Sequence, residues 1–168
     1  MFTGSIVLDT QAVLWFLQAS SKLSDVALKQ ITQPGRELYF SHASVWEIVI
    51  KHASGKLELA SPPESFLIDQ LSHNKIRLLP ISIASIFYVG KLPHFDHHKD
   101  PFDRLIAAQC LRHDLTLISI DRAFDLYGVR RAPTTVLADA TGRIVERLVG
   151  PEAVRDFIGT LDDPALHL

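Results

Sequence analysis

The sequence contains a single cysteine, Cys110, which excludes a disulfide-stabilised domain and a dithiol oxidoreductase. One thiol cannot form an internal disulfide or a two-thiol redox centre. No apolar run approaches the roughly 20 residues that a membrane-spanning helix needs. The first residues lack the basic stretch followed by an apolar one that is typical of a secretion signal. We therefore expect a cytoplasmic protein without a membrane segment.

The chain also lacks a large excess of charge of either sign. Its formal net charge is −2, from 17 lysines and arginines against 19 aspartates and glutamates. This balance predicts little overall attraction to a polyanion. Apolar residues make up 47% and charged residues 21% of the 168 residues, which is typical of a globular domain with a sizeable core.

Short apolar runs rich in β-branched residues alternate with helical patterns along the first 131 residues. Strands are expected at 5–10, 37–41, 76–81, 115–121 and 126–129. Helices are expected at 12–17, 25–33, 42–51, 62–73, 82–89, 101–113 and 122–125. The alternation predicts an α/β fold with a mainly parallel sheet covered by helices on both faces.

Four acids fall where such a sheet brings distant segments together. Asp9 and Asp121 close expected strands, Asp103 lies in the first turn of a helix, and Glu47 lies in a helix that follows a strand. Because sites in parallel sheets form at the C-terminal ends of the strands, we expect these carboxylates to converge. Clustered carboxylates repel unless protons or cations accompany them, and an all-oxygen donor set suits Mg²⁺ or Mn²⁺. The pattern predicts metal-dependent hydrolysis of a phosphodiester.

Some of the acids in these motifs also have purely structural explanations. Asp100 precedes Pro101, the expected first residue of a helix, so its carboxylate can serve as the N-cap. Glu47 can form a capping box with Ser44, or an i, i+4 ion pair with Lys51. Either use would explain these residues without any chemistry.

Four short motifs occur in a recognisable order. They are Leu8-Asp9-Thr10, Ser41-x-x-Ser44-x-Trp46-Glu47-Ile48, Asp100-Pro101-Phe102-Asp103-Arg104-Leu105-Ile106-Ala107-Ala108 and Ser119-x-Asp121-x-x-Phe124. Each is weak alone, but their order and spacing span roughly three quarters of the chain. Together they resemble a PIN domain, and among PIN domains a VapC-type toxin ribonuclease of a bacterial toxin–antitoxin pair.

The resemblance implies a fold, an activity and partners. The fold would be a PIN-like three-layer α/β fold with the first strand at the centre of the sheet. The activity would be metal-dependent endoribonuclease cleavage of RNA, with Mg²⁺ or Mn²⁺ as the cofactor. The partners would be an RNA substrate, a cognate VapB-type antitoxin and a second copy of the chain in a homodimer.

The resemblance also implies roles for individual residues. The catalytic residues, which would also bind the metal, are Asp9, Glu47, Asp103 and Asp121. Supporting residues are Thr10 and Ser119, which would orient a carboxylate or a metal-bound water molecule, and Asp100, which belongs to the Asp-Pro-Phe-Asp pattern of this subgroup and would be either a metal ligand or only the N-cap.

Basic residues near these motifs are the expected RNA contacts, because a near-neutral domain must rely on local patches. They are Lys51, Lys56, Lys99 and Arg104. The loop that contains His94, Asp96, His97 and His98 is a second possible metal site. Its spacing matches no ligand pattern on a regular element, so a solvated loop is the simpler interpretation.

Residues 132–168 lie beyond the family pattern. They carry a net charge of −3, whereas residues 1–131 carry +1. We expect a boundary after Arg131, followed by two strands joined by a turn at 140–142 and a helix at 151–161. This extension resembles the C-terminal β-hairpin and helix of a thioredoxin-like domain without its redox centre. It is too small to be stable alone.

Two other functions remain open. The chain could be a catalytically silent PIN-like binding module, although the intact set of four acids argues against lost activity. It could also be a nuclease inhibited by its own extension, with Arg143 or Arg147 entering the acidic cleft.

Overall fold

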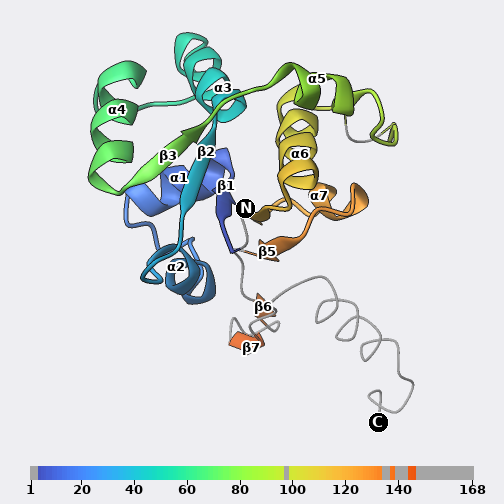
Figure 1. The fold of residues 1–168 in the computed structure, drawn as a ribbon. Helices are drawn as coiled ribbons and strands as arrows, with labels where there is room; N and C mark the ends of the chain where they lie inside the picture. The colour runs from blue at the N-terminus through green and yellow to red at the C-terminus, as the bar shows by residue number, and fades with distance from the viewer. Residues whose placement is uncertain (1–3, 97–98, 134–136, 139–143, 147–168) are drawn as a thin grey trace.

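Five parallel strands form the centre of the protein (Figure 1). The structure, a computed structural model, describes residues 4–96, 99–133, 137–138 and 144–146. The strands of the sheet are β1 (Ile6–Leu8), β2 (Leu38–Ser41), β3 (Ile76–Leu79), β4 (Thr116–Ser119) and β5 (Arg131–Pro133). Their order is β3-β2-β1-β4-β5. The expected parallel sheet, with the first strand at its centre, is confirmed.

Helices cover both faces of this sheet (Figure 1). They are α1 (Thr10–Leu17), α2 (Asp25–Ile31), α3 (His42–Ala53), α4 (Pro63–His73), α5 (Ile83–Val89), α6 (Pro101–His113) and α7 (Ala123–Leu126). One apolar core joins the sheet to α1, α2 and α4, and a second joins it to α5, α6 and α7. Ile6 and Leu8 of β1 enter the first core while Val7 enters the second, as the alternation of side chains along a strand requires. The result is the expected three-layer fold.

Several helices begin directly at the end of a strand, and polar caps fix these junctions. Asp9 follows β1 and caps α1, and Ser41 ends β2 and caps α3. Asp100 caps α6 through the amides of Phe102 and Asp103. The N-cap interpretation of Asp100 is therefore confirmed. Ser41, and not Ser44, caps α3, so the capping box proposed for Glu47 is wrong. These caps fix the first turns of α1, α3 and α6 at the C-terminal edge of the sheet (Figure 1).

The last strand of the sheet lies later in the chain than expected. The strand predicted at 126–129 is absent from the described residues, and β5 lies at Arg131–Pro133. The reason is the way in which α7 ends. Gly128 has φ +72°, and the amides of Gly128 and Val129 donate to the carbonyls of Asp125 and Phe124. This is a Schellman-type helix end, which uses the amides that a strand would need.

The boundary expected after Arg131 therefore falls inside β5. Ala132 and Pro133 pair with β4, and Ala132 belongs to an apolar core. We propose that the first domain extends at least to Pro133. Further along, β6 (Leu137–Ala138) pairs antiparallel with β7 (Ile144–Glu146), as expected for the hairpin. The turn at 140–142 and the helix predicted at 151–161 lie outside the described residues.

Cys110 of α6 is 1% exposed and packs in an apolar core, and its burial raises the pKa of the thiol. None of the helices in the described ranges is long and apolar enough to cross a membrane.

The position of β5 predicts how truncation changes stability. A chain that ends at residue 136 keeps the whole sheet, so it should retain one cooperative thermal transition. A chain that ends at Arg130 loses β5 and the buried Arg131, so its melting temperature should fall by roughly 5–10 °C. Circular dichroism melts of both chains beside the full length provide the measurement. Loss of the cooperative transition in the longer truncation would show that residues 137–168 are part of the fold.

Candidate acidic active site

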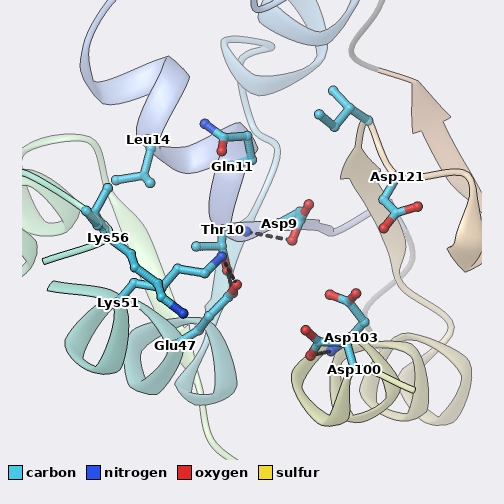
Figure 2. Close-up of a pocket in the computed structure, with 12 residues that line it drawn as sticks. Asp9, Thr10, Gln11, Leu14, Glu47, Lys51, Lys56, Asp100, Asp103 and Asp121 are labelled. Carbon is cyan, nitrogen blue, oxygen red and sulfur yellow. Dashed lines mark hydrogen bonds and ion pairs between the residues drawn. The ribbon is translucent and has the colours of Figure 1, made fainter. Parts of the chain in front are cut away.

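A polar cavity of about 380 Å³ opens at the C-terminal edge of the sheet (Figure 2). It is lined by all four predicted catalytic acids together with Asp100, Thr10 and two lysines. Figure 2 shows the carboxyl groups of Asp9, Asp103 and Asp121 turned toward the same space, with Glu47 and Lys51 across from them. The convergence expected from the strand and helix positions is therefore present in the fold.

Asp9 stands at the centre of this cluster, between β1 and α1. One carboxylate oxygen accepts from the amide of Thr10 at 2.7 Å, and the other accepts from the hydroxyl of Ser119 at 2.8 Å. Burial is the largest cause that raises the pKa of Asp9, these two hydrogen bonds oppose it, and the charges of Glu47 and Asp121 add smaller increases, with a net pKa of about 6. Ser119 thus orients Asp9, as its place beside the strand-end acid suggests.

Glu47 reaches the cavity from α3 and has two partners. Its Oε2 accepts from the hydroxyl of Thr10 at 2.5 Å, and its Oε1 accepts from the ammonium of Lys51 at 2.5 Å. The hydrogen bond to Glu47 raises the pKa of Lys51, so this ammonium stays charged. The i, i+4 ion pair that offered a structural explanation of Glu47 is present, but it lies on the wall of the cavity and not on a remote helix face.

Asp103 has the most strongly shifted pKa among the acids of the cavity. Burial in the first turn of α6 is the largest cause, followed by the charges of Asp9, Asp100, Asp121 and Glu47, and together they raise this pKa to about 8. A carboxyl group with such a pKa holds a proton at neutral pH unless a cation is close. Perturbation of this kind, in a cleft that gathers several acids, is typical of functional sites.

Asp121 follows β4 and is held by its own backbone. Its amide donates to the hydroxyl of Ser119 at 3.0 Å, and its Oδ1 accepts from the amide of Ala123 at 2.8 Å. One oxygen of Asp121 therefore anchors the start of α7. The hydroxyl of Ser119 connects the turn that contains Asp121 to Asp9, so the two strand-end acids are positioned as one unit.

The donor set fits a hard divalent cation. Carboxylate oxygens are the ligands that Mg²⁺ and Mn²⁺ prefer. Burial is the largest cause of the raised pKa values of Asp9 and Asp103, and the charges of neighbouring acids add to it; a divalent cation would offset the part that comes from those charges. Among the described residues, no three acidic, histidine or cysteine side chains already stand in a geometry that encloses an ion.

The predicted RNA contacts fall into two groups. Lys51 and Lys56 line the cavity, and Lys99 is exposed near Asp96, with 3.6 Å between Nζ and Oδ1. Arg104 is different, because it is only 7% exposed and its guanidinium donates to the carbonyls of Val89, Leu92 and Pro93. A buried guanidinium with these partners cannot also contact a phosphate. The assignment of Arg104 as an RNA contact is wrong, and it holds the loop after α5 instead.

Two of the four residues of the second possible metal site, His97 and His98, lie outside the described residues.

A separate cavity of about 470 Å³ lies between α3, α4 and β3. Its lining is almost entirely apolar and contains one acid, Glu64, so it offers no hydrolytic chemistry.

The sequence comparison decides which family this arrangement represents. Residues 6–129 match the model of the PIN domain. The chain belongs to the PIN domain family. The match covers the whole sheet up to the turn before β5, and with it every acid of the cavity. PIN domains are generally nucleases. No curated protein matches the chain by sequence.

Solved structures of toxin–antitoxin PIN domains share this fold. VapBC from Salmonella typhimurium, bound to DNA, superposes with a TM-score of 0.55 at 17% identity over 78% of this chain and 98% of that one. VapBC-1 from nontypeable Haemophilus influenzae gives 0.55 at 16% identity over 77% and 97%. VapBC2 from Rickettsia felis, bound to a promoter DNA fragment, gives 0.53 at 17% identity over 73% and 92%. At these identities the likeness shows the fold alone.

Two residues near the acidic cavity, Arg131 and Asp125, were not predicted from the sequence. Arg131 of β5 and Asp125 of α7 form an ion pair with 2.9 Å between Nε and Oδ1, and the arginine side chain is 3% exposed. Sequence alone could not single out Arg131, because it stands beside Arg130 just beyond the end of the family match. Only the pairing of β4 with β5 shows that one arginine faces solvent and the other the interior.

The raised pKa of Asp103 predicts how the metal-free protein depends on pH. Because this pKa lies above that of an unfolded aspartate, near 3.9, the folded state binds the proton more tightly. The stabilisation from this group is full below about pH 4 and is lost as the pH rises toward 8. In EDTA, Asp103→Asn should therefore melt higher than the wild type at pH 8.5, and the difference should shrink toward pH 4.

Asp69→Asn is the matched control for this measurement. Asp69 is exposed on α4 and does not line the acidic cavity, so its loss should give no pH-dependent gain. A lower melting temperature for Asp103→Asn at both pH values would mean that Asp103 is a structural acid.

Proposed function

We propose that this PIN domain is a metal-dependent endoribonuclease that acts as the toxin of a toxin–antitoxin pair. The observation that carries the proposal is the cavity in which Asp9, Glu47, Asp103 and Asp121 meet from four separate segments. The fold therefore gathers negative charge at one place. Burial, together with the charges of neighbouring acids, raises the pKa values of Asp9 and Asp103, and a divalent cation bound among these carboxylates would offset that charge.

The residues of the cavity have distinct roles in this proposal. Asp9, Glu47, Asp103 and Asp121 would hold Mg²⁺ or Mn²⁺, which when bound supplies charge stabilisation for the phosphodiester and a more acidic water. Ser119 holds the carboxylate of Asp9 through its hydroxyl. Thr10 does the same for Glu47. Asp100 positions the first turn of α6, and with it Asp103, by capping that helix.

Lys51 and Lys56 provide the basic wall of the same cavity. A phosphate group of the RNA would meet these two ammonium groups across from the acids (Figure 2). Lys99, exposed just before α6, would add a contact outside the cavity. With no net positive charge on the chain, affinity for RNA must come from such local contacts.

The partners follow from the similar proteins. The VapBC complexes from Salmonella and Haemophilus support a cognate VapB-type antitoxin as the partner of this chain. We extend the proposal to a homodimer, because the toxins that this chain resembles commonly dimerise. We also propose that the protein acts in the cytoplasm.

The two alternative functions differ in their support. A catalytically silent binding module would have no need for the set of acids that the cavity retains. Inhibition by the extension depends on Arg143 or Arg147, which both lie outside the described residues. The nuclease is therefore the proposal to test first.

Cleavage of RNA tests the proposal directly. The purified chain should cut total RNA with Mn²⁺ or Mg²⁺ and stop when EDTA is added, with cut sites mapped by end sequencing. Asp103→Asn and Glu47→Gln should each lower the rate of cleavage by at least about 100-fold, because each replaces a carboxylate of the proposed metal site by a neutral amide. Asp69→Asn, which makes the same change of charge on α4, should cleave like the wild type. Full activity of Asp103→Asn would refute the assignment of the site.

Expression in bacteria tests the toxin role. Wild-type protein produced without a partner should arrest growth, because uncontrolled RNA cleavage is toxic. Asp121→Asn should relieve the arrest while it keeps the acceptor that the amide of Ala123 needs at the start of α7. Colony counts and growth curves at matched soluble expression provide the measurement. Unimpaired growth with the wild type would favour the silent module or an inhibitory extension.

A further inference from the structure

The strand that follows the family match reaches back toward the acidic cavity through one buried arginine. Arg131 lies on β5, and its side chain is 3% exposed. Its Nε and Nη2 donate to the two carboxylate oxygens of Asp125 on α7, each at 2.9 Å. Its Nη1 donates to the backbone carbonyl of Ser119 at 2.9 Å. One guanidinium therefore joins β5, α7 and the last residue of β4.

Ser119 is the residue on which the two strand-end acids depend. Its hydroxyl donates to Asp9 and accepts from the amide of Asp121. A small shift of the Ser119 backbone would move this hydroxyl and change the position of both carboxylates. Arg131 fixes the carbonyl of the same residue, so it acts on Asp9 and Asp121 without touching either.

The turn between β4 and α7 needs such an anchor. It brings Asp121 close enough to Asp9 and Asp103 for its charge to raise the pKa of both acids. Repulsion among these carboxylates favours movement of Asp121 away from the cavity. Asp125 lies four residues after Asp121 and accepts two hydrogen bonds from Arg131, so the ion pair holds the turn through residues that do not line the cavity. Bidentate arginine–carboxylate pairs fix orientation as well as distance.

We propose that Arg131, paired with Asp125, is a positioning residue that holds the β4–α7 turn and thereby sets the geometry of Asp9 and Asp121 for the divalent cation. The proposal rests on the proposed function, since it assumes that these acids bind a metal. It adds a residue outside the family match to the machinery of the site. It also links the beginning of the C-terminal extension to that site, because the extension continues directly from β5.

The test is the affinity for Mn²⁺, measured on the full chain by the loss of the free-ion signal in electron paramagnetic resonance. Arg131→Met should weaken Mn²⁺ binding by about 10-fold or more, the range typical of partners that orient metal ligands. The thermal stability should fall as well, because Asp125 loses its partner. Stability alone would not separate positioning from a general structural role.

The double variant Arg131→Met with Asp125→Leu separates the two roles. It removes both charges, so no unpaired carboxylate remains and the melting temperature should recover toward that of the wild type. The carbonyl of Ser119 still lacks its donor, so Mn²⁺ binding should stay weak. Recovery of stability together with wild-type Mn²⁺ affinity would overturn the proposal and leave the pair a purely structural one.

Arg130→Met is the matched control. Arg130 is adjacent in the chain and pairs at the surface with Asp114, with 3.0 Å between Nη2 and Oδ1, and it makes no bond to Ser119. The Mn²⁺ affinity of Arg130→Met should equal that of the wild type.

The rate of RNA cleavage is a second readout. For Arg131→Met we expect a lower kcat and a nearly unchanged KM.

The outcomes distinguish this inference from the proposed function. A wild-type chain that binds no Mn²⁺ and cleaves no RNA would overturn both. A wild-type chain that binds Mn²⁺ while Arg131→Met and the double variant bind it equally well would overturn the inference and leave the nuclease standing.

Discussion

Repulsion among clustered carboxylates is the constraint around which this PIN domain is arranged. Burial and neighbouring charges raise the pKa of Asp103 to about 8 and that of Asp9 to about 6. Such a cluster persists only where the surrounding structure holds it in place. The parallel α/β topology does so, because helices begin at the strand ends and their first amides bond the acids. Asp9, Asp100 and Asp121 each accept from an amide at or next to the start of a helix.

The same constraint explains the choice of partners around the cavity. Hydroxyl groups hold two of the acids, Ser119 for Asp9 and Thr10 for Glu47, and a hydroxyl can orient a carboxylate without neutralising it. One ammonium, that of Lys51, pairs directly with Glu47. The arginines near the site are used differently, since Arg104 and Arg131 are buried and bind backbone carbonyls. Neither arginine is among the residues that line the cavity, and a divalent cation is the positive partner that the proposed cleavage of a phosphodiester requires there.

Much of the fold could be predicted because its signals are local. The β-branched runs, the proline at the start of α6 and the acids at strand ends located β1 to β4 and all seven described helices. The alternation of strands and helices was enough to place Asp9, Glu47, Asp103 and Asp121 at one edge of a parallel sheet. The prediction failed at β5, because a glycine two residues after α7 ends that helix with a turn that occupies the next amides.

The sequence by itself determined the fold class, the family and the identity of the acids, since each of these depends on the type and spacing of residues along the chain. Only the tertiary structure decided what the arginines do. Arginine side chains are usually exposed, so the sequence suggests that Arg104 and Arg131 face solvent. Both are buried, because a loop packs against Arg104 and a strand pairing places Arg131 in the interior. The tertiary structure also decided how strongly the carboxylates perturb one another, because burial and the approach of distant segments set the pKa values of Asp9 and Asp103.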